Sequence, residues 1–228
     1  MSLGIILTPD DRSKAYIQKC VRNGKKFDQI IFMNDERKEP IYDEKVIKTS
    51  KEYGFDISMP VKQTLRENNL EYTEFDFVDI NDMKLKEYLK EINLDFIIFT
   101  GGGILKEGIL SLKTKFIHMH PGLVPNYRGS TCFYYSILNE DETAVTCFIM
   151  DNMLDTGEVL SQKKFKKPNH QYLDSVFDPH IRSEALIELL QNDLKSKERI
   201  SQDPNEGETY YIIHPVLKHI AILRCVND

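Results

Sequence analysis

Short apolar runs alternate with amphipathic segments along this sequence, and this alternation constrains the fold more than any other feature. Runs with the length and composition of strands occur at residues 4–8, 28–33, 71–78, 95–100, 115–119, 144–150 and 159–165. Segments with apolar residues at helical spacing occur at residues 12–22, 61–68, 83–92, 104–112, 131–138 and 179–194. The sequence therefore predicts an α/β fold: a doubly wound, mostly parallel, Rossmann-like sheet flanked by helices.

Length and composition favour one domain. The chain has 228 residues, of which 41% are hydrophobic and 29% are charged, as in ordinary globular proteins. We expect a single domain over residues 1–228, in which residues 166–228 form a C-terminal helical and extended appendage. Residues 34–60 are charged, and we expect irregular structure there.

Charge and cysteine usage limit the classes of partner. The formal net charge of −6 disfavours a nucleic-acid partner, because phosphates attract basic surfaces. No apolar run approaches the roughly 20 residues of a membrane-spanning helix, and the first residues lack the basic leader of a signal peptide. The cysteines are scattered, without a Cys-x-x-Cys pair, which is typical of a reduced compartment. We expect a cytoplasmic protein that binds neither nucleic acid nor membranes; a homodimer is compatible with the sequence.

The strand pattern at residues 115–119 carries the main functional signal. His118 and His120 stand at its end, and a loop rich in proline and glycine follows: Pro-Gly-Leu-Val-Pro-Asn-Tyr-Arg-Gly. Doubly wound sheets bind ligands at the carboxyl ends of their strands, and an imidazole there can move protons near neutral pH. Asp155 lies 35 residues after His120, in an Asp-Thr-Gly turn that follows the strand pattern at 144–150. Its carboxylate could orient the imidazole and stabilise its charge.

These motifs resemble the formyltransferase family that uses N10-formyltetrahydrofolate. The resemblance rests on His-Pro-Gly-Leu-x-Pro-x-Tyr-Arg-Gly, on the spaced Asp-x-Gly, and on a Gly-Gly-Gly-Ile-Leu loop at residues 101–105, and it covers roughly residues 70–165. It implies a formyltransferase-like fold, formyl transfer to a small-molecule amine, and a reduced folate as co-substrate.

The resemblance also implies site residues. His120 would stabilise the oxyanion or move a proton, and Asp155 would hold and charge it. His118 stands where the family usually has asparagine; as a neutral imidazole it could donate one hydrogen bond in place of the amide. The residues expected to contact the folate are Gly102, Gly103, Ile104, Leu105, Met150, Asp151 and Leu154.

Other classes of function remain open. A His-x-His pair with a distant aspartate is also a pattern of metal-dependent hydrolases, although no third histidine is placed to complete a site, and we expect no metal. Because His118 replaces the family asparagine, the protein could also be a non-catalytic binder of folate or nucleotide. Hydrolysis of formyltetrahydrofolate, with water as acceptor, is a further alternative, and Asp151 is a second carboxylate close to Asp155.

Two acceptors used by members of this family are disfavoured by the sequence. The glycinamide ribonucleotide formyltransferase carries a glycine-rich phosphate loop after its first strand, whereas residues 8–12 here are acidic and lack glycine. The methionyl-tRNA enzyme carries a further C-terminal RNA-binding domain, whereas this sequence is acidic and short. We therefore expect the acceptor to be the amino group of a nucleotide-linked amino sugar.

Overall fold

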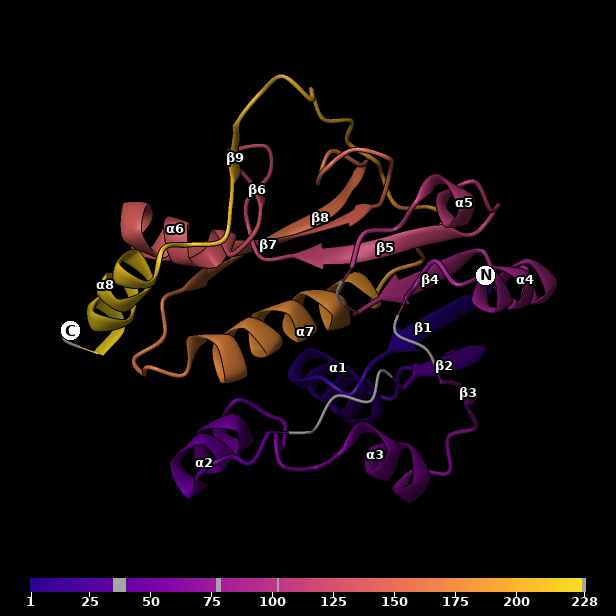
Figure 1. The fold of residues 1–228 in the computed structure, drawn as a ribbon, viewed down its shortest axis with the longest axis horizontal. Helices are drawn as coiled ribbons and strands as arrows, with labels where there is room; N and C mark the ends of the chain where they lie inside the picture. Colours follow the sequence, from indigo (N-terminus) through magenta and orange to yellow (C-terminus); the bar gives the residue numbers. More distant parts are fainter. Residues whose placement is uncertain (35–39, 77–78, 102, 227–228) are drawn as a thin grey trace.

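A seven-stranded sheet forms the centre of the described part of the chain (Figure 1). The structure is a computed structural model that describes residues 1–34, 40–76, 79–101 and 103–226. In spatial order the strands are β3 (Thr73–Phe75), β2 (Gln29–Met33), β1 (Leu3–Leu7), β4 (Phe96–Phe99), β5 (Lys115–His120), β7 (Glu142–Ile149) and β8 (Val159–Lys166). The first five are parallel, whereas β7 and β8 are antiparallel to their neighbours. The doubly wound, mostly parallel sheet is confirmed.

Helices cover both faces of this sheet. The described helices are α1 (Asp11–Arg22), α2 (Glu44–Glu52), α3 (Val61–Glu67), α4 (Met83–Ile92), α5 (Glu107–Leu110), α6 (Cys132–Glu140), a π-helical turn η1 (Leu173–Phe177), α7 (Asp178–Leu189) and α8 (Pro215–Val226), of which α2 packs on η1 and α8 on α6. A small second sheet pairs β6 (Tyr127–Gly129) with β9 (Glu208–Tyr210) in parallel.

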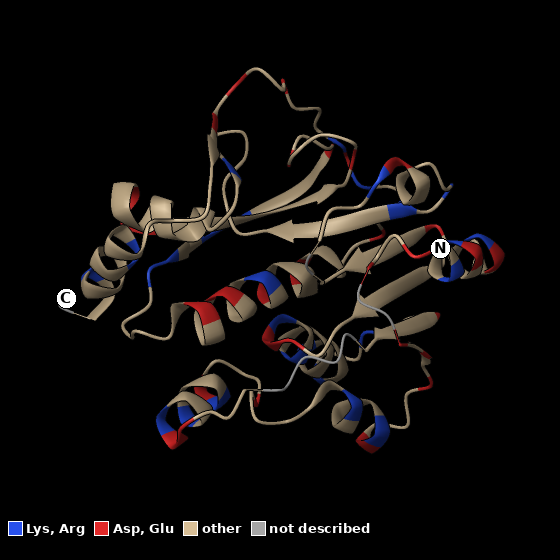
Figure 2. Cartoon of the chain, in the orientation of Figure 1, with Lys and Arg blue, Asp and Glu red and all other residues tan. Residues whose placement is uncertain are grey.

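The two faces have separate apolar cores, because strand side chains alternate in direction. Ile5 of β1 belongs to a core that includes residues of α1, α3, α6 and α7. Its neighbour Ile6 belongs to a second core with residues of α4 and α5. Most of the described charged residues are not buried, and Figure 2 shows acidic and basic residues interspersed along α2, α3 and α4. None of the described helices has the length and apolar character needed to cross a membrane.

Several predicted boundaries were wrong. The irregular structure expected over residues 34–60 contains α2, whose N-terminus is capped by Asp43. The helix expected over 104–112 is only the short α5, because Ile104 and Leu105 lie in the loop before it. The helix expected over 179–194 ends at Leu189.

The segment expected to be an appendage begins inside the main core. Helix α7 packs against α1 and lies below β5 and β7 in the view of Figure 1. Its residues Ile181, Ala185 and Leu186 belong to the larger core cluster. Residues on both sides of position 166 therefore belong to the same apolar core. The strand β9 and the helix α8 follow later in the segment 166–228.

Replacing Leu186 with alanine should test how central α7 is. The side chain is 0% exposed, so its loss should lower the free energy of unfolding by about 2–5 kcal/mol. Leu223→Ala on α8 is the control: that side chain is 40% exposed, and a much smaller loss is expected. Chemical denaturation measures both. Equal losses would mean that α7 packs no more tightly than α8.

Candidate active site

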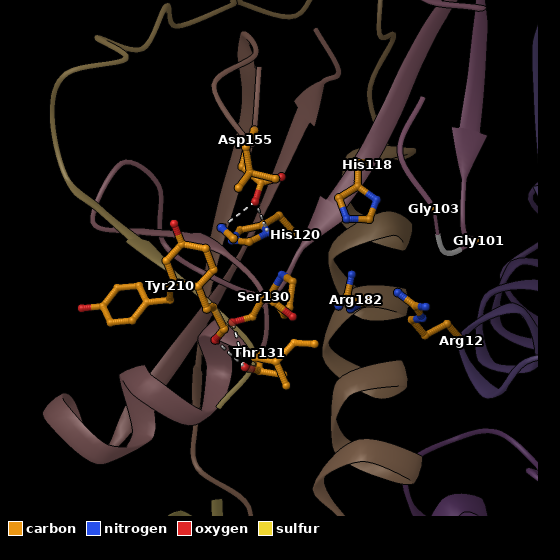
Figure 3. A pocket seen from close by; sticks show the side chains of 15 residues that line it. Arg12, Gly101, Gly103, His118, His120, Ser130, Thr131, Asp155, Arg182 and Tyr210 are labelled. Carbon is orange, nitrogen blue, oxygen red and sulfur yellow. Dashed lines mark hydrogen bonds and ion pairs between the residues drawn. The ribbon is translucent and has the colours of Figure 1, made fainter. Parts of the chain in front are cut away.

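The candidate site lies where β4 and β5 end, with the turn of Asp155 above it in Figure 3. His118 and His120 are two residues apart on β5, so both side chains point to the same face. They pair with Phe148 and Thr146 of β7. The strands β5 and β7 pair antiparallel, with Ile117 opposite Ile149, and the segment after β7 folds back so that Asp155 reaches His120.

His120 is enclosed by protein on both of its ring nitrogens. The side chain is 2% exposed. Its Nε2 lies 2.8 Å from the Tyr127 carbonyl oxygen, and its Nδ1 lies 3.3 Å from Asp155 Oδ2. A carbonyl can only accept, so Nε2 carries a hydrogen, and the imidazole and the carboxylate share the next proton. Burial lowers the pKa of His120, and the Asp155 carboxylate and the Tyr127 carbonyl oppose that shift.

Asp155 is held by the backbone around it. Its φ is +54°, in the left-handed region, and the Gly129 N–H donates to its Oδ2 at 2.7 Å. A Cβ at Gly157 would lie 1.7 Å from the Ile149 carbonyl oxygen, so glycine is required where this turn meets β7. The Gln202 side chain donates to the carbonyls of Asp155 and Gly157 at 3.2 and 2.7 Å. His120 and Asp155 thus come together as expected.

Asp151 has a different place in the same turn. Its Oδ1 accepts from the Met153 N–H and from the Thr156 hydroxyl, both at 3.0 Å. These bonds close the turn on itself, and the residue is exposed. The carboxylate that meets the imidazole is therefore Asp155.

His118 is half-buried between the rings of Phe99 and Phe148, whose centroids lie 6.4 and 5.9 Å from its own. Its Nδ1 is buried and has no hydrogen-bond partner among the described residues. Burial lowers the pKa of His118 well below its usual value, and the charges of Arg182, His120 and Arg12 add to that effect. The ring is therefore neutral near pH 7.

Two cavities meet at these side chains. The apolar cavity, of about 300 Å³, is lined by six of the seven residues that the sequence assigned to the folate. They are Gly103, Ile104, Leu105, Met150, Asp151 and Leu154, joined by Phe99 and Phe148. Gly102 was assigned as well and lies outside the described residues.

The second, arginine-lined cavity has a volume of about 400 Å³. Its wall includes Arg12, Arg182, His120, Thr131 and Tyr211. The two cavities share the residues Gly101, Gly103, His118, Leu154 and Asp155. His118 and Asp155 thus face both spaces.

Sequence reasoning missed Arg12 and Arg182. Arg12 lies in the first turn of α1, where its sequence pattern indicates only the start of a helix. Arg182 lies on α7, 62 residues after His120, and its helical pattern gives no sign of a cavity. An arginine on the buried side of an amphipathic helix was the available signal, since such a residue needs a partner or a ligand.

Arg128, within the motif, clamps a segment outside it that leads to the rim of the arginine-lined cavity. The Arg128 guanidinium donates to the carbonyls of Asp203, Pro204 and Glu206 and to the Gln202 side chain, at 2.7–3.1 Å. This holds the chain that leads through β9 to Tyr211. Among the described residues, no group of three or more His, Cys, Asp or Glu side chains is arranged to hold a metal ion.

Gly122 should be required for the position of His120. A Cβ at this residue would lie 2.5 Å from the Tyr127 carbonyl oxygen and 2.6 Å from His120 Nε2. Gly122→Ala should therefore lower the free energy of unfolding by about 1–3 kcal/mol. Gly108→Ala is the matched control, because its nearest neighbour would be the mobile end of Lys86 at 3.6 Å and alanine favours the helix. Denaturation curves that coincide for the two variants would contradict the close contact.

Comparison with known proteins agrees with this geometry. The family model described as Formyl transferase matches residues 43–176. A methionyl-tRNA formyltransferase of Finegoldia magna is 32% identical over 148 residues, which are 62% of this chain and 48% of that protein. The chain spans about half or less of the curated relatives that it matches, with 48, 37 and 42% for three of them.

Solved structures share the fold. An N-formyltransferase of Helicobacter canadensis, in complex with folinic acid and dTDP-3-aminofucose, has a TM-score of 0.65 at 16% identity, covering 99% of this chain and 81% of its own. A sugar N-formyltransferase of Shewanella has a TM-score of 0.59 at 18% identity, covering 99% and 88%. Because the family model covers more than half of the sequence, including His120 and Asp155, this chain belongs to the formyl transferase family.

Proposed function

We propose that this protein transfers the formyl group of N10-formyltetrahydrofolate to the amine of a second substrate. The observation that carries this proposal is the shared wall of the two cavities, where His118 and Asp155 face both spaces. A planar folate ring fits the apolar cavity, and an amine in the arginine-lined cavity would then reach the formyl carbon at the junction. Holding two reactants at such a junction removes much of the entropic barrier to their reaction.

The residues at the junction can carry out both proton transfers. Attack by the amine nitrogen forms a carbon–nitrogen bond and turns the formyl oxygen into an oxyanion. Asp155 Oδ1 makes no hydrogen bond with any described residue, so it is available to take the amine proton. The proton shared by His120 and Asp155 can then pass to the folate nitrogen as its bond to the formyl carbon breaks. The number of protons on the pair is restored at the end.

His118 completes the site as a neutral group. An N–H of its neutral ring would serve as a donor to the oxyanion, the part that the family asparagine plays. Donors of this kind contribute about 2.7–4 kcal/mol to stabilising a transition state. A charged His118 would instead repel a protonated His120.

For the acceptor we propose the amino group of a nucleotide-linked amino sugar. The Helicobacter canadensis protein was solved with a dTDP-linked amino sugar, and residues 8–12 here lack the glycines of a phosphate loop. Relatives by sequence are methionyl-tRNA formyltransferases, so methionyl-tRNA is the second candidate. Hydrolysis is less well supported, since water alone would not need a cavity of about 400 Å³.

A folate-release assay with a panel of acceptors tests this assignment. The panel holds dTDP- and UDP-linked amino sugars, glycinamide ribonucleotide, methionyl-tRNA and a control without acceptor. Turnover that requires an amino sugar supports the proposal. Release at the same rate without any acceptor would establish a hydrolase, and failure to bind 5-formyltetrahydrofolate would remove the proposal altogether.

Removing either member of the pair should abolish most turnover. His120→Ala and Asp155→Asn should each reduce kcat by roughly 100-fold or more, the scale of a positioned acid or base. Binding of 5-formyltetrahydrofolate should change far less. The exposed residues His219 and Asp193 provide the matched controls His219→Ala and Asp193→Asn, which should keep full activity. Near-normal turnover in either active-site variant would show that the residue only packs there.

The pH profile should report His118. Its pKa lies well below 6.5, so the ring gains a proton only as the pH falls through that lowered value. Activity that needs neutral His118 should therefore persist at pH 6.5 and fall at lower pH, with His120 adding a second protonation. His118→Asn should keep much of the turnover and make the acid limb shallower. Profiles of kcat/KM for both proteins measure this, and an identical acid limb would show that His118 does not set it.

A further inference from the structure

We propose that Arg12 and Arg182 bind an oxyanion carried by the acceptor, so that its anionic group lies against α1 and α7. This inference rests on the proposed function, because it takes the arginine-lined cavity as the acceptor site. Figure 3 shows both guanidinium groups on one side of that cavity, across from Tyr210.

Arg182 is a fixed part of the wall. It is 7% exposed, its Nε donates to Asp178 at 2.7 Å, and its Nη1 donates to the Met119 carbonyl at 2.6 Å. Its Nη2 makes no hydrogen bond with any residue that the structure describes. Two bonds thus hold the planar group in place, and the third nitrogen remains for a ligand. A guanidinium fixed in this way loses little side-chain entropy on binding.

Arg12 offers a second guanidinium with most of its donors unused. The side chain is 27% exposed, and its ion pair within the described chain is to Asp10 Oδ2 at 3.7 Å. The other carboxylate oxygen of Asp10 accepts from the Ser13 N–H at 2.7 Å, which caps α1. Asp10 is therefore the N-cap of α1, and its other carboxylate oxygen is too far from Arg12 for a direct hydrogen bond.

The carboxylates near the two guanidinium groups make other contacts, although the Asp10 carboxylate, 3.7 Å from Arg12, also acts on Arg182 and offsets part of the positive charge. Asp178 is paired with Arg182, and Asp155 is paired with His120 and Gly129. Both guanidinium charges also act on His118 and disfavour its protonated form. An oxyanion between Arg12 and Arg182 would meet unused donors from two elements, and planar guanidinium groups match phosphate and carboxylate oxygens well.

The side chains on the cavity rim across from the arginines indicate which chemical group the rest of the acceptor carries. Tyr211 and Ile212 line the same cavity and are 80% and 79% exposed. Apolar side chains at this rim favour a ring or methyl face over a second charge. The acceptor would therefore be a molecule with its anionic group toward Arg12, its amine near Asp155 and an apolar face toward Tyr211.

Calorimetric titration with small anions tests the inference. Inorganic pyrophosphate should bind the wild-type protein at low ionic strength, and Arg12→Gln should weaken this binding roughly ten- to hundredfold, the scale of a charged hydrogen bond. Arg12→Lys should restore part of it. Arg66→Gln, which removes one positive charge from the exposed face of α3, should leave the affinity unchanged. A parallel titration with acetate distinguishes phosphate recognition from carboxylate recognition.

Titration with 5-formyltetrahydrofolate separates this inference from the proposed function. Arg12→Gln should bind the folate as the wild type does. Wild-type protein that binds folate but neither pyrophosphate nor acetate would overturn the oxyanion site while leaving formyl transfer intact. Equal loss of folate and pyrophosphate binding in Arg12→Gln would assign the arginines to the folate and overturn the inference. Arg12-dependent pyrophosphate binding without folate binding would support the oxyanion site and reject the proposed function.

Discussion

The enclosure of the His120 ring by two backbone segments is the constraint on which the rest of the site depends. A ring that is 2% exposed must have partners for both nitrogens. The loop after β5 returns to place the Tyr127 carbonyl at one nitrogen, and the turn after β7 places Asp155 at the other. Side chains at positions 122, 129 and 157 would each collide with a backbone carbonyl oxygen, within 2.5 Å or less. Glycine at these positions allows the segments to meet closely enough.

This enclosure also explains why an imidazole can stand where relatives are expected to have an amide. His118 shares its strand face with the buried His120, and the charges of Arg12 and Arg182 act on it. Burial and these charges all disfavour a second positive ring. The substitution thus introduces a titratable residue at the junction without introducing a charge near neutral pH. What changes is the size and direction of a neutral hydrogen-bonding group.

The sequence pattern predicted those elements of the fold that are determined by residues close to them in the sequence. The strand β5 and the turn at Asp155 were found because apolar runs end in sequences with few alternative conformations. Helix α2 was missed because only Val46 and Ser50 on it are buried, so its charged sequence has little apolar periodicity. The start of α5 was wrong because Ile104 and Leu105 line a cavity instead of a helix face. The sequence could not predict that Arg182 lies in the site, because its hydrogen bond to the Met119 carbonyl of β5 depends on how α7 packs across the sheet.

The Arg128 clamp divides the chemistry of this protein from its choice of acceptor. His118, His120 and Asp155, the proposed reacting groups, lie within residues 43–176, the part that matches the family model. Tyr211 and Ile212, at the rim, lie beyond it and are attached to the scaffold through main-chain atoms: carbonyls at 203–206 accept from Arg128, and the carbonyls of Tyr210 and Tyr211 accept from the Ser130 N–H and the Tyr135 hydroxyl. Carbonyl contacts do not depend on side-chain identity, so the sequence of the rim is free to vary while the rim stays in place. Descendants of such a chain could evolve toward new amines through the rim alone, with the proton-transfer machinery inherited unchanged.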